Sequence, residues 1–192
     1  MIKSIGLAIL ILLTLVCLFN SKIRIGKIVA GHFKSFKNDR TGKVSLFDYL
    51  TFIVLPIAIS AYATLALNIF LNDVNVLLTV FSIFTALLFN FLMLVIQMKD
   101  KPKEELKKVN VNIDIEKCFK CIDQTYYNVS FAILLSILAI LLLWVISIIP
   151  PEKLLAIKIM SVITETAIIM FFMDLIMILK RIFAIYNIDN KK

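Results

Sequence analysis

The sequence LLAIKIMSVITETAIIMFFMDLIMIL, residues 154–179, decides the fold of this chain. An α-helix rises about 1.5 Å per residue, so this stretch is long enough to cross the hydrocarbon core of a bilayer, which is about 30 Å thick. It nevertheless contains Lys158, Glu165 and Asp174. A carboxylate at the centre of a membrane helix costs on the order of 3 kcal/mol unless it faces protein or water. We therefore predict a transmembrane helix whose Glu165 side points into protein.

The rest of the composition supports a membrane protein. Of 192 residues, 61% are hydrophobic and 18% are charged, which excludes an ordinary soluble domain. We predict an all-α integral membrane protein that forms a single membrane domain over residues 1–192. Its four transmembrane helices are expected at 46–71, 76–98, 131–149 and 154–179. A shorter apolar run, 5–19, is predicted as an N-terminal helix that either spans the membrane or anchors at its interface.

The predicted helix 46–71 carries two packing signals. Pro56 lacks a backbone N–H and should kink the helix. Ser60, Thr64 and Asn68 recur at every fourth residue, so they lie on one face. Small polar residues at this spacing are typical of contact between membrane helices, and we expect another helix to pack there.

The charged residues inside the membrane do not share one face. Lys158 and Glu165 are seven residues apart and lie along the same side of their helix, where Glu165 could line a polar seam or be a hydrogen-bonded structural group. Asn90, in the helix 76–98, is a candidate partner for this carboxylate. Asp174 falls on the opposite side, and we expect it to pair at the membrane surface with the basic residues 180–181.

A basic segment follows the N-terminal run. Residues 20–44 contain seven basic side chains and one acidic side chain. Apolar residues at helical spacing alternate with a basic stripe, which predicts an amphipathic helix on the inner leaflet with its charges among anionic lipids. A basic loop within 20–45 that only fixes orientation is the alternative. The candidate docking residues of the stripe are Arg24, Lys27, Lys34 and Lys37.

The predicted loop 99–129 contains a strand signal. Residues 109–116, VNVNIDIE, alternate apolar and polar side chains without interruption. We predict a short β-strand there, within a small cytoplasmic layer, that pairs by its edge with a neighbouring subunit or a soluble partner. An extended linker is the alternative. The apolar residues that would face the partner are Val109, Val111, Ile113 and Ile115.

The distribution of charge predicts the topology, and the motifs argue against an enzyme. Most Lys and Arg residues lie in the two large loops and the C-terminus, which we therefore place in the cytoplasm. Cys118 and Cys121 form a lone C-x-x-C, and a zinc site needs four ligands while His32 is the single histidine. No hydrolase or metalloprotease motif is present. We expect no catalytic residues, no cofactor and no metal.

One segment suggests a family. Residues 32–60, HFKSFKNDRTGKVSLFDYLTFIVLPIAIS, together with the chain length and the two inner loops, resemble the small membrane subunit of the Kiwa anti-phage defence system. This resemblance implies a homo-oligomer, expected to be a tetramer, that senses phage attachment at the bacterial inner membrane. It also implies a cytosolic DNA-binding partner protein, so that this chain itself is not expected to bind nucleic acid.

Two functions follow as hypotheses. The first is a non-enzymatic membrane sensor and scaffold that recruits its partner through residues 22–44 and 109–121. The second is an oligomeric pore-forming effector, in which Glu165 from several subunits lines a path for cations.

Overall fold

The computed structural model describes residues 25–36, 46–67, 73–100, 112–150 and 152–189, and all regular structure within these ranges is helical. The predicted N-terminal helix 5–19 lies outside them. The elements are α2 (Ile25–Lys34), α3 (Leu46–Tyr49), the π-helix η1 (Leu50–Val54), α4 (Leu55–Leu65), α5 (Val74–Asp100), α7 (Asn112–Ile148) and α8 (Leu154–Asp189).

Three of these helices are long and apolar enough to cross a membrane. They cover Val74–Lys99, Cys118–Ile148 and Leu154–Asn187, which confirms an all-helical fold of membrane-spanning character for the predicted helices at 76–98, 131–149 and 154–179. The fourth predicted span, 46–71, contains a shorter apolar helix, Leu50–Leu65. A count of spans beyond three therefore stays a prediction.

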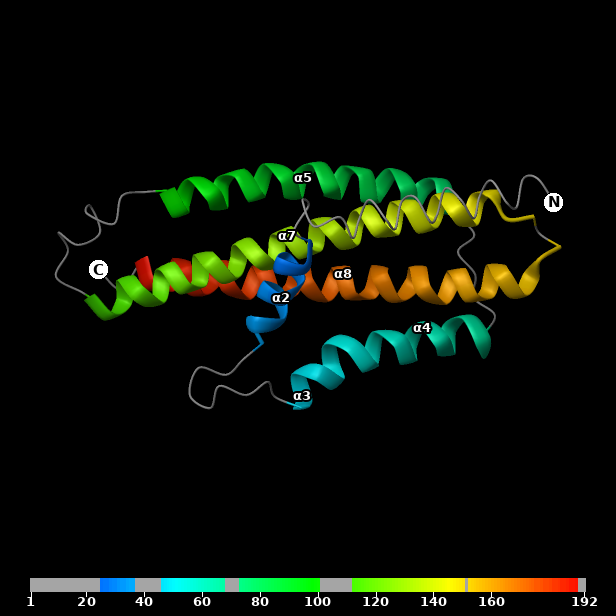
Figure 1. Ribbon diagram of the computed structural model, residues 1–192, viewed down its shortest axis with the longest axis horizontal. Coiled ribbons are helices and arrows are strands. Elements are labelled where there is room, and N and C mark those ends of the chain that lie inside the picture. The colour runs from blue at the N-terminus through cyan, green and yellow to red at the C-terminus, as the bar shows by residue number, and fades with distance from the viewer. Residues whose placement is uncertain (1–24, 37–45, 68–72, 101–111, 151, 190–192) are drawn as a thin grey trace.

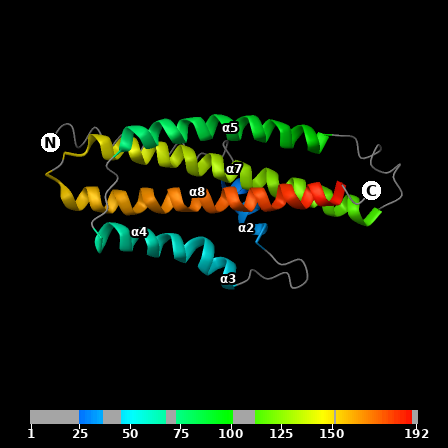
Figure 2. The ribbon, with the colours of Figure 1, turned by 180° about the vertical axis from the view of Figure 1, so that it is seen from behind.

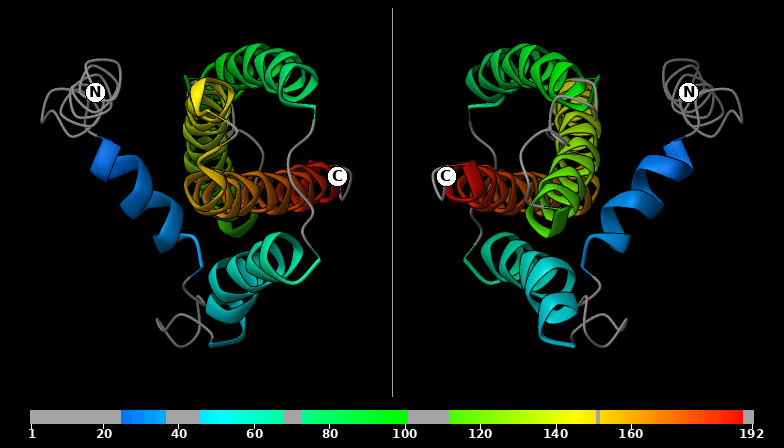
Figure 3. Two further views of the ribbon diagram at one scale, coloured as in Figure 1. Left: turned by 90° about the vertical axis from the view of Figure 1, so that its right-hand side faces the viewer. Right: turned by 90° about the vertical axis from the view of Figure 1, so that its left-hand side faces the viewer.

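The long helices pack side by side along one direction. α7 lies between α5 and α8, and α4 packs against α8 on the side away from α5 (Figure 1). The view from behind, in Figure 2, brings α8 to the front and leaves α2 on the far side. The end-on views in Figure 3 show α2 leaving the group of long helices at an angle. α2 is thus a short helix laid across one flank of the bundle.

Small side chains on α7 allow its neighbours to approach closely. Ala132, Ser136 and Ala139 are fully buried and recur at three- and four-residue spacing, so they form one smooth face. Thr85 of α5 donates a hydrogen bond to the Ser136 hydroxyl over 2.9 Å. Phe171 of α8 packs into the same core. α7 is therefore the central helix, against which the others are positioned.

The π-helix takes the place of the kink predicted at Pro56. The Leu55 N–H donates to the carbonyl oxygen of Leu50, five residues earlier, and Pro56 follows in the first turn of α4. A proline inside an α-helix leaves the carbonyl four residues earlier without its donor and clashes with it. The wider turn, with its five-residue pairing, places this irregularity just before the proline.

The strand predicted at 109–116 is wrong for its described part. α7 begins at Asn112 and continues without a break to Ile148, so Ile113 and Ile115 are helical, whereas Val109 and Val111 lie outside the described residues. A lone strand leaves its backbone N–H and C=O groups unpaired, but each residue added to an existing helix gains a hydrogen bond. Extension of the helix therefore prevails over a short alternation.

The predicted loop 99–129 is mostly helix for the same reason. α5 continues to Asp100, and its end packs on α7 several turns after α7 begins. Lys99 Nζ lies 2.7 Å from the Asp123 carboxylate and 5.4 Å from the centre of the Tyr126 ring. These contacts hold the end of α5 against α7.

α2 is amphipathic as predicted, but its apolar side packs on protein. Ile28 and Val29 contact the core that surrounds α7, while Lys27 and Lys34 are exposed. Gly31 lies directly against α7, since a Cβ atom at this position would overlap the Tyr127 ring. Only a residue without a side chain lets α2 reach α7 at this distance.

Replacing Gly31 with alanine should loosen α2. Overpacking against Tyr127 costs about 1–3 kcal/mol, and the better helix propensity of alanine recovers about 1 kcal/mol. Hydrogen exchange of the α2 amides, followed by mass spectrometry, should therefore be faster in Gly31→Ala than in the unchanged protein. Gly26→Ala is the matched control, because nothing lies within 4 Å of the added methyl group, and its α2 amides should exchange no faster. Equal exchange in Gly31→Ala and the unchanged protein would contradict this account of the α2–α7 contact.

Candidate functional site

The predicted polar seam around Glu165 lies between α4 and α8. Thr64 donates a hydrogen bond to Glu165 Oε2 over 3.0 Å, and the Ser60 and Thr166 hydroxyl oxygens are 2.6 Å apart. Ser60 and Thr64 are fully buried, so the polar face predicted on this helix packs against α8, as expected. Asn68 lies outside the described residues. Lys158 is half-buried and lies two turns before Glu165 on the same side of α8.

Asn90 is not the partner of Glu165. Its side chain is exposed on α5, whereas Glu165 faces α4 and bonds to Thr64. α5 packs on α7 and α4 packs on α8, so these two residues belong to different contacts. Asn90 was predicted as the partner from its residue type alone, but the packing of α4 on α8 places the Thr64 hydroxyl beside the Glu165 carboxylate.

Half of the predicted docking residues lie within the described ranges. Lys27 and Lys34 are exposed on α2, and Ile113 and Ile115 lie in the first turns of α7. Arg24, Lys37, Val109 and Val111 lie outside these ranges. The two lysines thus lie on the exposed side of α2, whose opposite side packs against the bundle.

Asp174 is buried, contrary to the surface pairing predicted for it. Its residue is 2% exposed, and its Oδ1 atom lies 3.6 Å from Nε2 of His32, which is 3% exposed. His32 belongs to α2 and Asp174 to α8, so this contact fixes the short helix to the bundle. The side opposite to Glu165 was predicted correctly, but Asp174 meets another helix there and not the membrane surface.

α7 contributes an amide to the same cluster. His32 Nδ1 lies 3.2 Å from Asn128 Oδ1, and the Ser35 hydroxyl donates to that oxygen over 3.2 Å. Asn128 is fully buried. Phe131, one turn further along α7, stacks on the imidazole with ring centres 4.0 Å apart. The histidine is therefore held by an acceptor on one edge and by an aromatic face.

Arg181 closes the cluster on its polar side. One of its nitrogens, Nη1, donates to Gln124 Oε1, and the other, Nη2, donates to the Ser35 carbonyl oxygen over 3.3 Å. The guanidinium thus joins α8 to α7 and to the end of α2. Residue 181 was predicted to pair with Asp174 at the membrane surface, but its hydrogen bonds to Gln124 and Ser35 connect it to other helices.

The surroundings keep His32 neutral. Burial lowers the pKa of His32 from 6.5 to about 4, since an imidazolium would lose its hydration. The hydrogen bond with Asn128 acts in the opposite direction, and the charge of Arg181 adds to the lowering. An uncharged histidine accordingly donates Nδ1–H to Asn128, since Asn128 Oδ1 can only accept.

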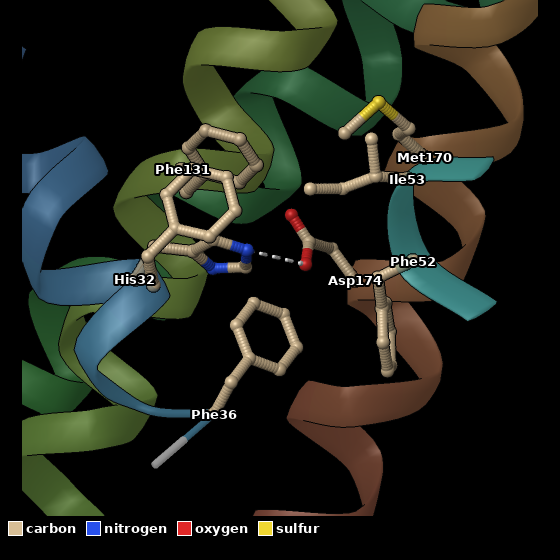
Figure 4. A pocket seen from close by; sticks show the side chains of 8 residues that line it. His32, Phe36, Phe52, Ile53, Phe131, Met170 and Asp174 are labelled. Atoms are coloured by element: carbon tan, nitrogen blue, oxygen red, sulfur yellow. Dashed lines mark ion pairs between the residues drawn. The ribbon is translucent and has the colours of Figure 1, made fainter. Parts of the chain in front are cut away.

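A small cavity lies beside the His32–Asp174 contact. Its walls come from α2, η1, α7 and α8, and it has room for about one water molecule. Figure 4 shows His32 and Asp174 pointing toward each other, with Phe131 stacked on the imidazole. The remaining wall residues are Phe33, Phe36, Phe52, Ile53 and Met170. The site is an apolar chamber with one histidine and one carboxylate in it.

The chemistry of the site follows from these groups. Within the described part of the chain, no three His, Cys, Asp or Glu side chains gather as metal ligands. The groups that do meet are one imidazole, one carboxylate and one amide from three helices. Such a set can hold or pass a proton and can fasten α2 to the bundle.

His32 and Asn128 were missed by sequence reasoning. His32 was weighed only as a zinc ligand, although it is the single histidine and lies on the apolar side of a predicted amphipathic helix. Asn128 directly precedes the apolar run 129–149, where a polar residue marks a contact. A buried acid such as Asp174 needs a partner, and the positions of His32 and Asn128 in the sequence could have indicated one.

Comparison of the chain with protein-family models, with curated proteins and with solved structures finds no match.

Docking of α2 should weaken as the pH falls from about 6.5 to about 4. In this window an undocked, hydrated His32 binds a proton and the docked one does not, so the docked state loses up to about 3 kcal/mol of stability relative to the undocked state. A spin label on Lys27→Cys, with the native cysteines replaced by serine, should become more mobile over this range.

The variant His32→Gln serves as the control for this titration. It lacks the imidazole, so its label mobility should not change between pH 6.5 and pH 4 beyond what other groups cause. An identical pH response with and without His32 would show that this residue does not control α2.

Proposed function

We propose that this chain is a non-enzymatic sensor and scaffold of the bacterial inner membrane, which forms homo-oligomers and recruits a cytosolic partner in anti-phage defence. The observation that carries the proposal is the attachment of α2. This helix is fastened to the bundle by a buried histidine, while Lys27 and Lys34 on its other side are exposed. A basic helix held in this way links the membrane bundle to whatever acidic surface binds the lysines.

The contacts of α2 favour a signalling element over a mere topological loop. A loop that only sets orientation needs basic charge and no defined packing. α2 and the turn that follows it instead make four polar contacts with α7 and α8, through His32 and Ser35, and fit closely at Gly31. Motion of α7 relative to α8 would change these contacts directly and alter how the lysines are presented.

The full topology belongs to the same proposal. Three long apolar helices are joined by a fourth span at 46–71 and an N-terminal membrane helix or anchor at 5–19. Both large loops and the C-terminus face the cytoplasm, because most basic residues lie there. Lys27 and Lys34 then lie where anionic lipid headgroups are found.

The partner is proposed from the resemblance of residues 32–60 to the Kiwa membrane subunit. In that reading the chain is a tetramer and holds a cytosolic DNA-binding protein, while it does not itself bind nucleic acid. The exposed lysines of α2 suit an acidic face on that protein. Of the segment 109–121, the described residues 112–121 would add to the contact as the beginning of α7 and no longer as a strand edge.

A pore is less well supported. Glu165 would have to face an aqueous path shared by several subunits. Its carboxylate instead accepts a hydrogen bond from Thr64 of the same chain, in the seam between α4 and α8. That bond supports a structural role for Glu165.

The docking claim can be tested by reversing charge on α2. The double variant Lys27→Glu, Lys34→Glu should insert into the membrane normally but lose most co-purification with the cytosolic protein encoded beside it. Replacing two exposed cations should weaken a charge-matched contact by tenfold or more, chiefly at low salt. Lys153→Glu is the control, since this exposed lysine lies in the turn before α8, far along the chain from α2.

Protection of cells against phage infection gives a second measurement. Cells that carry both proteins should survive infection, and the double variant should reduce this survival while Lys153→Glu should not. Unchanged co-purification of the double variant would refute docking through α2. An absence of protection with the unchanged pair would refute the defence role.

A further inference from the structure

The His32–Asp174 contact brings two acceptors together. His32 Nδ1 carries the hydrogen that Asn128 Oδ1 accepts, so in the neutral ring Nε2 has a lone pair. That lone pair faces Asp174 Oδ1 at 3.6 Å, which is too long for a direct hydrogen bond. Two acceptors in an apolar site repel each other unless a proton or a donor molecule lies between them.

The second carboxylate oxygen adds to this requirement. Asp174 Oδ2 is fully buried and has no hydrogen-bond partner among the described residues. Figure 4 shows it pointing into the cavity, between Phe131 and the side chains of Ile53 and Met170. The cavity walls supply no further side-chain donor, because apart from His32 and Asp174 they consist of phenylalanine, isoleucine and methionine. A buried carboxylate oxygen left in this way has lost its hydration without a replacement hydrogen bond, which destabilises the docked state.

The size of the space selects the ligand. It holds about one water molecule, which can donate two hydrogen bonds, and it is too small for a larger polar molecule. A water molecule placed there could donate to His32 Nε2 and to Asp174 Oδ2. One additional proton on the pair removes the remaining repulsion between the two side chains.

We propose that His32 and Asp174 form a proton-binding site, in which one proton and one water molecule are held between the two side chains, and that this proton fastens α2 to α8. When the proton leaves to solvent, the carboxylate faces a lone pair and the docked state loses its bond. When a second proton arrives, the imidazole becomes a buried cation near Arg181. α2 is therefore held most firmly while the pair carries one proton.

Few other charges act on this site. α8 contributes Arg181 in addition to Asp174, and α2 contributes Lys34, whose side chain is exposed. α7 presents the uncharged Asn128 and Phe131, with Tyr127 against Gly31, and η1 (LTFIV) has no ionisable residue. The proton equilibrium is thus set mainly by His32, Asp174 and Arg181.

The single histidine makes the site directly observable. Full-length protein labelled with ¹⁵N-histidine, in lipid nanodiscs, gives one pair of ring nitrogen signals. At neutral pH we expect hydrogen on Nδ1, a hydrogen-bonded Nε2, and magnetisation transfer from water to the ring. As the pH is raised, the ¹⁵N chemical shift of Nε2 should change in one step while the ring stays neutral, because the proton of the pair is lost.

Two matched variants assign that step. Asp174→Asn keeps the shape of the side chain but cannot bind the proton, so the step should disappear. Glu165→Gln removes the other carboxyl group of α8, which bonds to Thr64 in a different contact, and it should keep the step. Hydrogen exchange of the α2 amides, corrected for the intrinsic rate, should be slowest while the pair carries one proton, should rise by up to about tenfold per pH unit as the pH increases from neutral toward the step, and should then level off. In Asp174→Asn this rise should be lost.

Four results would overturn the proposal. They are a wild-type ring with hydrogen on Nε2 alone, no transfer from water to the ring, a step that persists in Asp174→Asn, and an exchange rate of α2 that does not follow the step. The first two need only the unchanged protein, so they decide the question even where Asp174→Asn fails to fold.

Discussion

The need to satisfy buried polar groups in apolar surroundings governs this molecule. Asp174, on a helix that is long and apolar enough to cross a membrane, is almost completely buried, and a carboxylate there needs a partner from another element. α2 brings that partner as His32, and α7 orients the imidazole through Asn128. A helix of ten residues would be marginal alone. The acid on α8 therefore explains why α2 lies where it does.

Close packing makes this contact possible. Gly31 lets α2 approach Tyr127, and the small residues of α7 let α5 and α8 come near on its other sides. The polar bonds set the orientation of α2, and the packing sets its distance. The seam between α4 and α8 uses the same combination, with Ser60 and Thr64 as small polar residues. Both contacts need a short side chain opposite a longer polar one.

Local signals allowed prediction of the helices and one seam, while the site depended on long-range packing. Long apolar runs specify membrane helices by themselves, and the spacing of Ser60 and Thr64 marked their face. The partner of Asp174 could not be predicted because His32 is 142 positions earlier and its helix could have lain on lipid. The strand predicted at 109–116 is wrong from residue 112 onward, because alternation over eight residues is weaker than continuation of α7. Asn90 was chosen as a partner by chemistry, without knowledge of which helices touch.

The π-helix forms one wall of the cavity, and this wall lies outside the seam between α4 and α8. Phe52 and Ile53 belong to η1, while α4 beyond Pro56 is bonded to α8 through Ser60 and Thr64. Exchanging one five-residue pairing for a four-residue pairing changes the helical register by one residue, which is a turn of about 100°. Such a change upstream of Pro56 would swing both side chains around the helix axis without breaking the seam. The irregular turn thus separates the chamber beside Asp174 from the hydrogen-bonded seam between α4 and α8.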